Sequence, residues 1–279
     1  MTKTIFIKKA DGTSEPFLSS KLEQSLTRAG ASKPVIQEII EKVTARLVEG
    51  VTTKEIYQDA FSLLRDKEKE LVVAAKYSLK KAVFDLGPSG FPFEDFITEI
   101  YRARDFEVST GTILQGRCAE HEVDLFARKK SKKYGAEIKF HNHQGIKTDL
   151  KVALYVHARF EDLIKSKEVD EGILITNTKF TKTAIAYGKC VGLEMISWDY
   201  PKGGEESLYS LIEDSGLHPI TCLTTIPKGD KKRLLEGDIV LCRTIKEDTS
   251  ILETYGIASD RIPLILKEIN TLCQPGSGV

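Results

Sequence analysis

The chain has 279 residues, 41% of them hydrophobic and 29% charged, so it can bury one large core or two modest ones. It lacks an apolar run of 18 residues and the stages of a secretory signal, so we expect a protein without membrane spans that works in the cytoplasm. Five scattered cysteines with no Cys-x-x-Cys spacing fit reduced thiols in that compartment.

Charge gives a second limit, because 41 basic and 41 acidic residues cancel to a net charge of zero. This excludes a globally basic nucleic-acid binder and confines any such surface to a local patch. The strongest basic run covers residues 128–133. It lies at a predicted hairpin tip, where lysines are usually solvated, although they could meet phosphates.

The first third of the chain predicts a small, mostly helical unit that begins with a β-hairpin. Strands are expected over residues 4–9 and 15–17 around the Asp11-Gly12 turn, because Asp-Gly between apolar runs favours a hairpin. Helices follow, with apolar residues recurring close to every 3.6 positions. Thr52 and Glu55 have capping-box spacing at the start of the third helix, and a fourth is expected over residues 67–85.

The segment 86–92 contains two glycines and two prolines, which end helices and mark a linker. Beyond it, strand and helix patterns alternate as far as residue 198, which is typical of a layered α/β domain. After residue 201 the pattern is helical. We therefore predict an α/β protein in three parts, a mostly helical unit with a hairpin, a mixed-sheet α/β domain and a helical appendage, over residues 1–87, 91–201 and 205–274.

The central part holds a candidate site for phosphodiester hydrolysis. A hairpin would bring Asp124 beside the triplet Glu137-Ile138-Lys139, whose first and last residues share one face of a strand. Such hydrolysis needs a divalent cation held by oxygen ligands. Asp124 and Glu137 are the predicted metal ligands, and Lys139 could position or deprotonate the attacking water. An exposed hairpin with a cross-strand ion pair would produce the same spacing.

The order of these residues resembles the PD-(D/E)xK fold in its Mrr-type restriction endonuclease branch. The resemblance also includes Phe93-Glu94-Asp95-Phe96 before them and the run over residues 173–181 after them. The resemblance covers about residues 91–198 and implies DNA cutting with Mg²⁺ or Mn²⁺. It implies the catalytic set Glu94, Asp124, Glu137 and Lys139. Family members often carry glutamine where this chain has Glu137, and the acidic version favours activity.

A different metal site is also conceivable, because Cys-x-x-His and His-x-His pairs can bind zinc. The residues concerned are Cys118, His121, His141 and His143. Their spacing matches no established zinc pattern, and solvent-facing or DNA-contacting histidines explain them equally well. Gln144, which follows them, is a candidate for contacting substrate or water.

The segment 7–12, with Glu15-Pro16-Phe17 and Lys21-Leu22, resembles the start of an ATP-cone domain over about residues 3–85. The resemblance implies ATP or dATP as an effector, and its nucleotide-binding residues would be Lys8, Lys9, Asp11, Gly12 and Lys21. Ala10 separates the basic pair from the turn, which departs from the family's register. Lysines beside a helix N-terminus favour phosphate. The sequence has no Walker A motif, so the domain is expected to sense a nucleotide rather than hydrolyse it.

Together the two resemblances imply a magnesium-dependent, restriction-like DNA endonuclease gated by an adenine nucleotide. A homodimer or larger assembly is expected, because cutting both strands requires two active sites. One alternative is a nucleotide-responsive DNA-binding regulator that does not cut, and another is a structure-selective junction resolvase. The C-terminal helices could form a plain cap or a helix-hairpin-helix-like DNA module around Tyr255-Gly256-Ile257.

Overall fold

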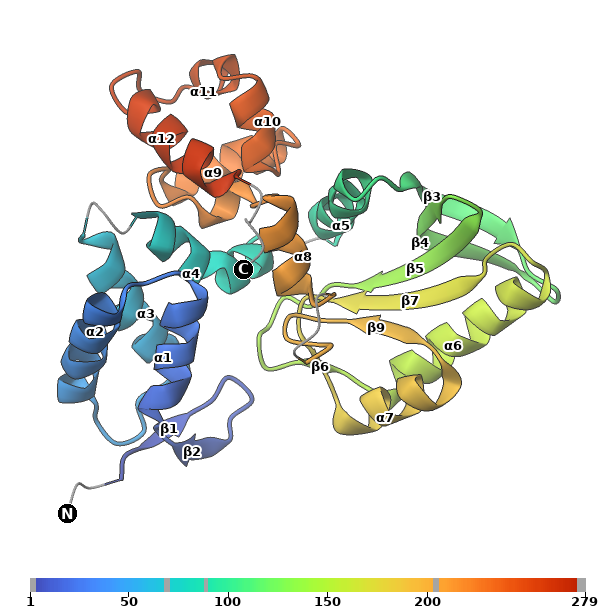
Figure 1. Ribbon diagram of the computed structural model, residues 1–279, viewed down its shortest axis with the longest axis horizontal. Helices are drawn as coiled ribbons and strands as arrows, with labels where there is room; N and C mark the ends of the chain where they lie inside the picture. Colours follow the sequence, from blue (N-terminus) through green and yellow to red (C-terminus); the bar gives the residue numbers. More distant parts are fainter. Residues whose placement is uncertain (1–3, 68–70, 88–89, 203–205, 275–279) are drawn as a thin grey trace.

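The structure, a computed structural model, describes residues 4–67, 71–87, 90–202 and 206–274. Figure 1 shows a helical N-terminal part with a hairpin, a central part with helices on both faces of a sheet, and a group of C-terminal helices. The predicted fold class is therefore confirmed. In the described ranges, no helix is both long enough and apolar enough to cross a bilayer.

The N-terminal part packs one hairpin against four helices. Its elements are β1 (Phe6–Lys8), β2 (Ser14–Pro16), α1 (Ser19–Arg28), α2 (Lys33–Arg46), α3 (Thr53–Arg65) and α4 (Leu71–Phe84). The predicted capping box is present, since the Thr52 hydroxyl accepts from the Glu55 N–H and the Glu55 carboxylate accepts from the Thr52 N–H. Leu26, Ile39 and Leu64 are fully buried in the core that α1, α2 and α3 share.

Helix α4 belongs to two cores. Ala74 packs with the N-terminal helices, whereas Leu79, Ala82 and Val83 pack with residues of the central sheet and the C-terminal helices. The hydroxyl of Thr221, far along the chain, donates to the carbonyl of Ala82 over 2.7 Å. The first part is therefore continuous with the rest of the molecule through a buried helix.

The central part is a five-stranded mixed sheet. Its strands, in spatial order, are β3 (Glu107–Gln115), β4 (Glu120–Lys129), β5 (Lys132–Lys139), β7 (Glu171–Thr176) and β9 (Glu194–Ile196). The first three are antiparallel, and β7 and β9 continue parallel to β5. The short strands β6 (Lys147–Thr148) and β8 (Lys179–Phe180) pair separately.

Each face of the sheet is covered by helices, as Figure 1 shows. Helix α5 (Phe91–Ala103) buries Phe96 and Ile100 in a core that also contains Ala136 and Ile138 of β5. On the opposite face, α6 (Leu150–Lys165) and α7 (Lys182–Val191) bury side chains such as Phe160 against the sheet. Alternate residues of β5 therefore face different cores, as the period of a strand requires.

The C-terminal part is helical, as predicted. Its elements are α8 (Leu208–Ser215), the 3₁₀ turn η2 (Ile220–Cys222), α9 (Lys228–Glu236), α10 (Cys242–Glu247), α11 (Ser250–Thr254) and α12 (Ile262–Leu272). Figure 1 shows these helices beside α4 and α5. Gly256 has a left-handed φ of 72° in the turn after α11, and a DNA-binding role for this turn stays a prediction.

Candidate functional site

The first feature of the candidate site is the place where β4 and β5 separate. Their last paired residues are Leu125 and Ala136. Beyond that pair, the Asp124 carboxylate accepts a hydrogen bond of 2.7 Å from the backbone N–H of Ile138. The side chain of Asp124 thus replaces a backbone acceptor, which holds the two strands apart where both predicted metal ligands lie.

Glu137 and Lys139 lie two residues apart on β5 and form an ion pair with each other. Glu137 is 2% exposed, so its charge needs partners close by. Its second oxygen is bound by Arg159 of α6. Both oxygens of this carboxylate therefore have a cationic partner.

Glu94 reaches the same place from the first turn of α5. Burial raises the pKa of the Glu94 carboxyl, and the negative charges of Asp124, Asp95 and Glu137 raise it further, while Lys139 opposes them. These mutual effects mean that Glu94 lies in the electrostatic neighbourhood of the sheet residues. The structure thus places Asp124, Glu137 and Lys139 where β4 and β5 separate, with Glu94 within range of their charges.

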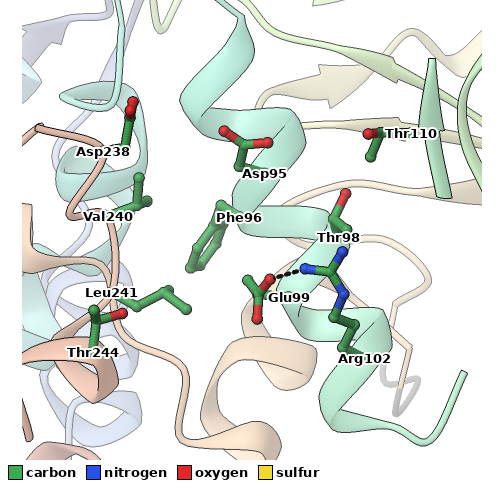
Figure 2. Close-up of a pocket in the computed structure, with 10 residues that line it drawn as sticks. All are labelled: Asp95, Phe96, Thr98, Glu99, Arg102, Thr110, Asp238, Val240, Leu241 and Thr244. Atoms are coloured by element: carbon green, nitrogen blue, oxygen red, sulfur yellow. Dashed lines mark hydrogen bonds and ion pairs between the residues drawn. The ribbon is translucent and has the colours of Figure 1, made fainter. Parts of the chain in front are cut away.

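Asp95, the next residue along α5, has a different environment. It lines a cavity of about 370 Å³ between α5 and the C-terminal part, which Figure 2 shows with Asp238 and Glu99 nearby. Burial raises the pKa of the Asp95 carboxyl, and the charges of Asp238 and Glu99 add to the rise. The acidic character of this cavity disfavours phosphate, so of the two adjacent acids only Glu94 contributes to the candidate site.

Arg159 is the residue of this site that sequence reasoning missed. Besides Glu137, its guanidinium donates to the carbonyl of Glu122 over 3.0 Å and to the hydroxyl of Tyr155. Arg159 therefore fixes α6 against β4 and β5 at the candidate centre. No motif marks it, because it lies 22 residues beyond Glu137 on another element.

The chemistry of the donor set fits a hard divalent cation. Asp124 and Glu137 offer carboxylate oxygens, and Mg²⁺ commonly takes one or two carboxylates and completes its shell with water and substrate phosphates. In the described ranges, no group of three or more His, Cys, Asp or Glu side chains is arranged to hold a metal. Two of the three histidines of the zinc alternative have other partners: His121 bonds Asp162 over 2.9 Å, and His141 bonds Thr148 over 3.0 Å.

A second site is a cavity of about 870 Å³ beside the N-terminal hairpin. Lys8, Lys9 and Lys21 line it, whereas Asp11 and Gly12 are not among its lining residues. The carboxylate of Asp11 instead accepts from the hydroxyl of Thr13 over 2.6 Å.

The charge of this cavity favours an anion. Two of its lining residues are acidic, Glu15 and Asp85, and eight are lysine or arginine, so phosphate groups would find an excess of positive charge. The eight are Lys8, Lys9, Lys21, Arg28, Lys54, Lys76, Lys80 and Lys81. Glu15 pairs with both Lys9 and Lys21 over 2.9 Å, so an incoming phosphate would compete with this carboxylate.

The basic run over residues 128–133 is largely occupied. The ammonium of Lys129 donates to the carbonyl of Arg104, that of Lys133 donates to the carbonyl of Lys167, and Lys132 pairs with Glu171. These contacts tie the β4–β5 hairpin to its neighbours. They favour a structural role for the run over a phosphate-binding one.

Comparison with known proteins shows the family to which this chain belongs. A protein of Archaeoglobus fulgidus described as an uncharacterized protein is 40% identical over 140 residues, which is 50% of this chain and 78% of that relative. A solved structure described as "Crystal Structure of Protein of Unknown Function AF1548" is 31% identical, has a TM-score of 0.52, and corresponds to 66% of this chain and 98% of its own. The chain belongs to the AF1548-like family.

Three family models match successive parts of this AF1548-like protein. The ATP cone domain matches residues 5–82, the restriction endonuclease domain of the Mrr type matches residues 88–201, and the AF1548-like C-terminal domain matches residues 218–273. The suspected fusion of an ATP cone with an Mrr-type endonuclease domain is thus confirmed. The 870 Å³ cavity lies against the ATP cone match. The residues Glu94, Asp124, Glu137 and Lys139 lie within the restriction endonuclease match.

Proposed function

We propose that this AF1548-like protein is a divalent-cation-dependent DNA endonuclease whose cutting is regulated by an adenine nucleotide. The observation that carries the proposal is the position of Asp124, Glu137 and Lys139 at the point where β4 and β5 separate, and the charge effects of these residues on Glu94 support it. The Mrr-type family match over the same residues supports a phosphodiester substrate.

Each side chain has a distinct part in the proposed reaction. Asp124 and Glu137 would hold the cation, which when bound stabilises negative charge on the scissile phosphate and lowers the pKa of a water. Lys139, whose ammonium already contacts Glu137, would orient the attacking water by donating a hydrogen bond to its oxygen. Glu94 would add a third carboxylate beside the cation site, from helix α5 rather than from the sheet.

Arg159 would hold Glu137 in place for this reaction. A buried carboxylate without a cation nearby is strongly disfavoured, and Arg159 compensates the charge of Glu137 from α6. Because the guanidinium also contacts the backbone of β4, it fixes the orientation of the carboxylate relative to Asp124.

The test is a cleavage assay with purified full-length protein. Supercoiled, linear, methylated and four-way branched DNA are incubated with Mg²⁺, Mn²⁺ or EDTA, each with and without ATP. Cutting that requires the cation and changes with ATP would support the proposal. Cutting confined to branched DNA would instead support a junction resolvase with the same metal chemistry.

One observation favours a non-cutting regulator as the second candidate. Both oxygens of Glu137 are engaged by Lys139 and Arg159, so a metal ion must either share these oxygens with two positively charged side chains or displace one of them. If the protein binds DNA but cuts no substrate under any of the cation conditions, the endonuclease proposal is wrong and the regulator takes its place.

The nucleotide part of the proposal gives a pH prediction through Lys80, which lines the 870 Å³ cavity. Burial lowers the pKa of Lys80 to about 8, partly opposed by the charge of Asp199. Its ammonium is therefore charged below that pH and loses its charge above it. ATP affinity is expected to fall roughly tenfold as pH rises from about 7 to 9, since a charged hydrogen bond contributes about 1.5 kcal/mol.

Calorimetric titration with ATP at several pH values checks this expectation. Lys80→Met should bind ATP more weakly at pH 7 and lose most of the pH dependence. Lys42→Met is the matched control, because Lys42 pairs with Glu38 on α2 outside the cavity. An affinity for ATP that is constant from pH 7 to 9 in the unmodified protein would contradict the assignment.

A further inference from the structure

The 870 Å³ cavity is bounded by the nuclease part as well as by the ATP cone. Asn142, His143 and Gln144 line it from the loop 140–146, which joins β5 to β6. This loop begins directly after Lys139. Trp198, which is 5% exposed, also lines the cavity from just beyond β9. One wall of the cavity is therefore the continuation of the candidate catalytic strand.

Both ends of the 140–146 loop are held rigidly. The backbone N–H of His141 donates to the side chain of Asn177, and the Asn177 amide donates back to the His141 carbonyl, each over 2.9 Å. Asn177 is fully buried. After the loop, the hydroxyl of Thr148 donates to Thr176 at the end of β7 over 3.2 Å. Hydrogen bonds at both ends therefore join the loop to residues 176–177 at the end of β7.

The tip of the loop touches the β1–β2 turn. A Cβ atom added to Gly145 would lie 2.7 Å from the carbonyl oxygen of Ala10, so only glycine permits this approach. Lys147 adds an ion pair to Asp11 over 3.5 Å. Two of the cavity lysines, Lys8 and Lys9, directly precede Ala10, so the loop and the hairpin meet beside the anion-favouring wall.

The start of the loop also reaches the helix that carries Glu94. The ring of Phe140 packs against Phe93 with centroids 5.4 Å apart. A Cβ added to Gly90, whose carbonyl accepts from the N–H of Glu94 over 3.0 Å, would lie 3.9 Å from the Cβ of Phe140. Phe140 thus links the loop to Glu94, as its backbone links the loop to Lys139.

We propose that the nucleotide is bound between the β1–β2 hairpin and the 140–146 loop, so that the nuclease part forms half of the binding site and the loop transmits occupancy to Lys139 and Glu94. This inference rests on the proposed function and assigns the regulatory contact to named residues. ATP would bring the lysines of the hairpin and the tip of the loop onto one ligand, which restricts the conformations of the loop.

Trp198 provides a direct test of the shared wall, because it is the single tryptophan of the chain and it belongs to the nuclease part. ATP is titrated into the full-length protein while tryptophan fluorescence and heat of binding are recorded separately. We expect a saturable fluorescence change with the same dissociation constant as the calorimetric one. Heat of binding without any change in Trp198 fluorescence, or no binding at all, would overturn the inference.

Two glycines provide a matched pair of substitutions. Gly145→Ala places a methyl group against Ala10 and should raise the dissociation constant for ATP about fivefold or more. Gly229→Ala adds the same methyl group in open space on α9 and should leave the constant unchanged. Gln144→Ala, which removes a lining side chain without a clash, should also weaken ATP binding. Equal ATP affinity in all three variants would refute the shared site.

Hydrogen exchange separates this inference from the proposed function. ATP should slow amide exchange over residues 139–146 in the unmodified protein and have a smaller effect in Gly145→Ala. Neither the affinity nor the exchange measurement depends on DNA cutting. If ATP protects the loop but no DNA is cut, the endonuclease proposal fails alone; if DNA is cut but ATP leaves the loop unprotected, the transmission fails alone.

Discussion

Asp124→Asn is expected to lower the rate of DNA cutting on the order of 10³-fold, because it removes a charge from the predicted cation site. The amide oxygen of asparagine can still accept the hydrogen bond that the Ile138 N–H donates to Asp124, so the separation of β4 and β5 should persist. Lys139→Met, which keeps the length of the side chain but removes its charge, should cause a loss of similar size. Single-turnover cutting rates at saturating DNA measure both effects.

Asp95→Asn is the matched control for this series. Asp95 is adjacent to Glu94 in the sequence, but it faces the acidic cavity beside Asp238, so the same carboxylate-to-amide change should leave the cutting rate within about twofold. DNA affinity, measured by fluorescence anisotropy in EDTA, should also be retained in Asp124→Asn. Normal cutting by either Asp124→Asn or Lys139→Met would refute the catalytic assignment.

Arg159→Ala is expected to destabilise the central part by less than the roughly 3–5 kcal/mol that a fully unpaired buried charge costs, because Lys139 stays beside Glu137. Glu137 is 2% exposed and would keep Lys139 as its cationic partner. A divalent cation that binds this carboxylate replaces the lost positive charge. Mg²⁺ should therefore raise the melting temperature of the variant more than that of the unmodified protein.

Thermal unfolding followed by circular dichroism, with and without Mg²⁺, measures this difference. Lys165→Ala is the control on the same helix, because Lys165 forms an exposed pair with Glu161 and such pairs contribute less than about 1 kcal/mol. The idea that Arg159 neutralises a cation-binding carboxylate is wrong if Mg²⁺ raises the melting temperatures of Arg159→Ala and of the unmodified protein equally.

Much of the fold follows from local patterns. The Thr52 capping box and the 3.6-residue spacing in α2 depend on neighbours in the sequence, so they can be recognised without tertiary information. Strand β3 (Glu107–Gln115) shows the limit of such patterns. Most of its side chains are partly or fully exposed, so it lacks the apolar alternation that marks a half-buried strand.

The same distinction applies to the candidate site. Glu137 and Lys139 could be assigned to one strand face because a strand repeats every two residues, and their ion pair agrees with that placement. Their catalytic role stays a prediction. The contact of Arg159 with Glu137 depends on packing between distant segments, and no local spacing in the sequence encodes it. The same is true of the positions of Gln144 and Trp198 in the cavity wall. A contact of Gln144 with substrate or water stays a prediction, and the structure places this residue in the lining of the 870 Å³ cavity.

Helix α4 determines how this protein can be dissected. By sequence it ends the part that matches the ATP cone domain, yet Leu79 and Val83 are fully buried in the core of the remainder. A truncated chain that starts after α4 would expose that apolar surface to water, which favours aggregation. An inactive deletion would therefore report a damaged core rather than a missing activator. The question of what the nucleotide does is better asked with point substitutions in the intact chain.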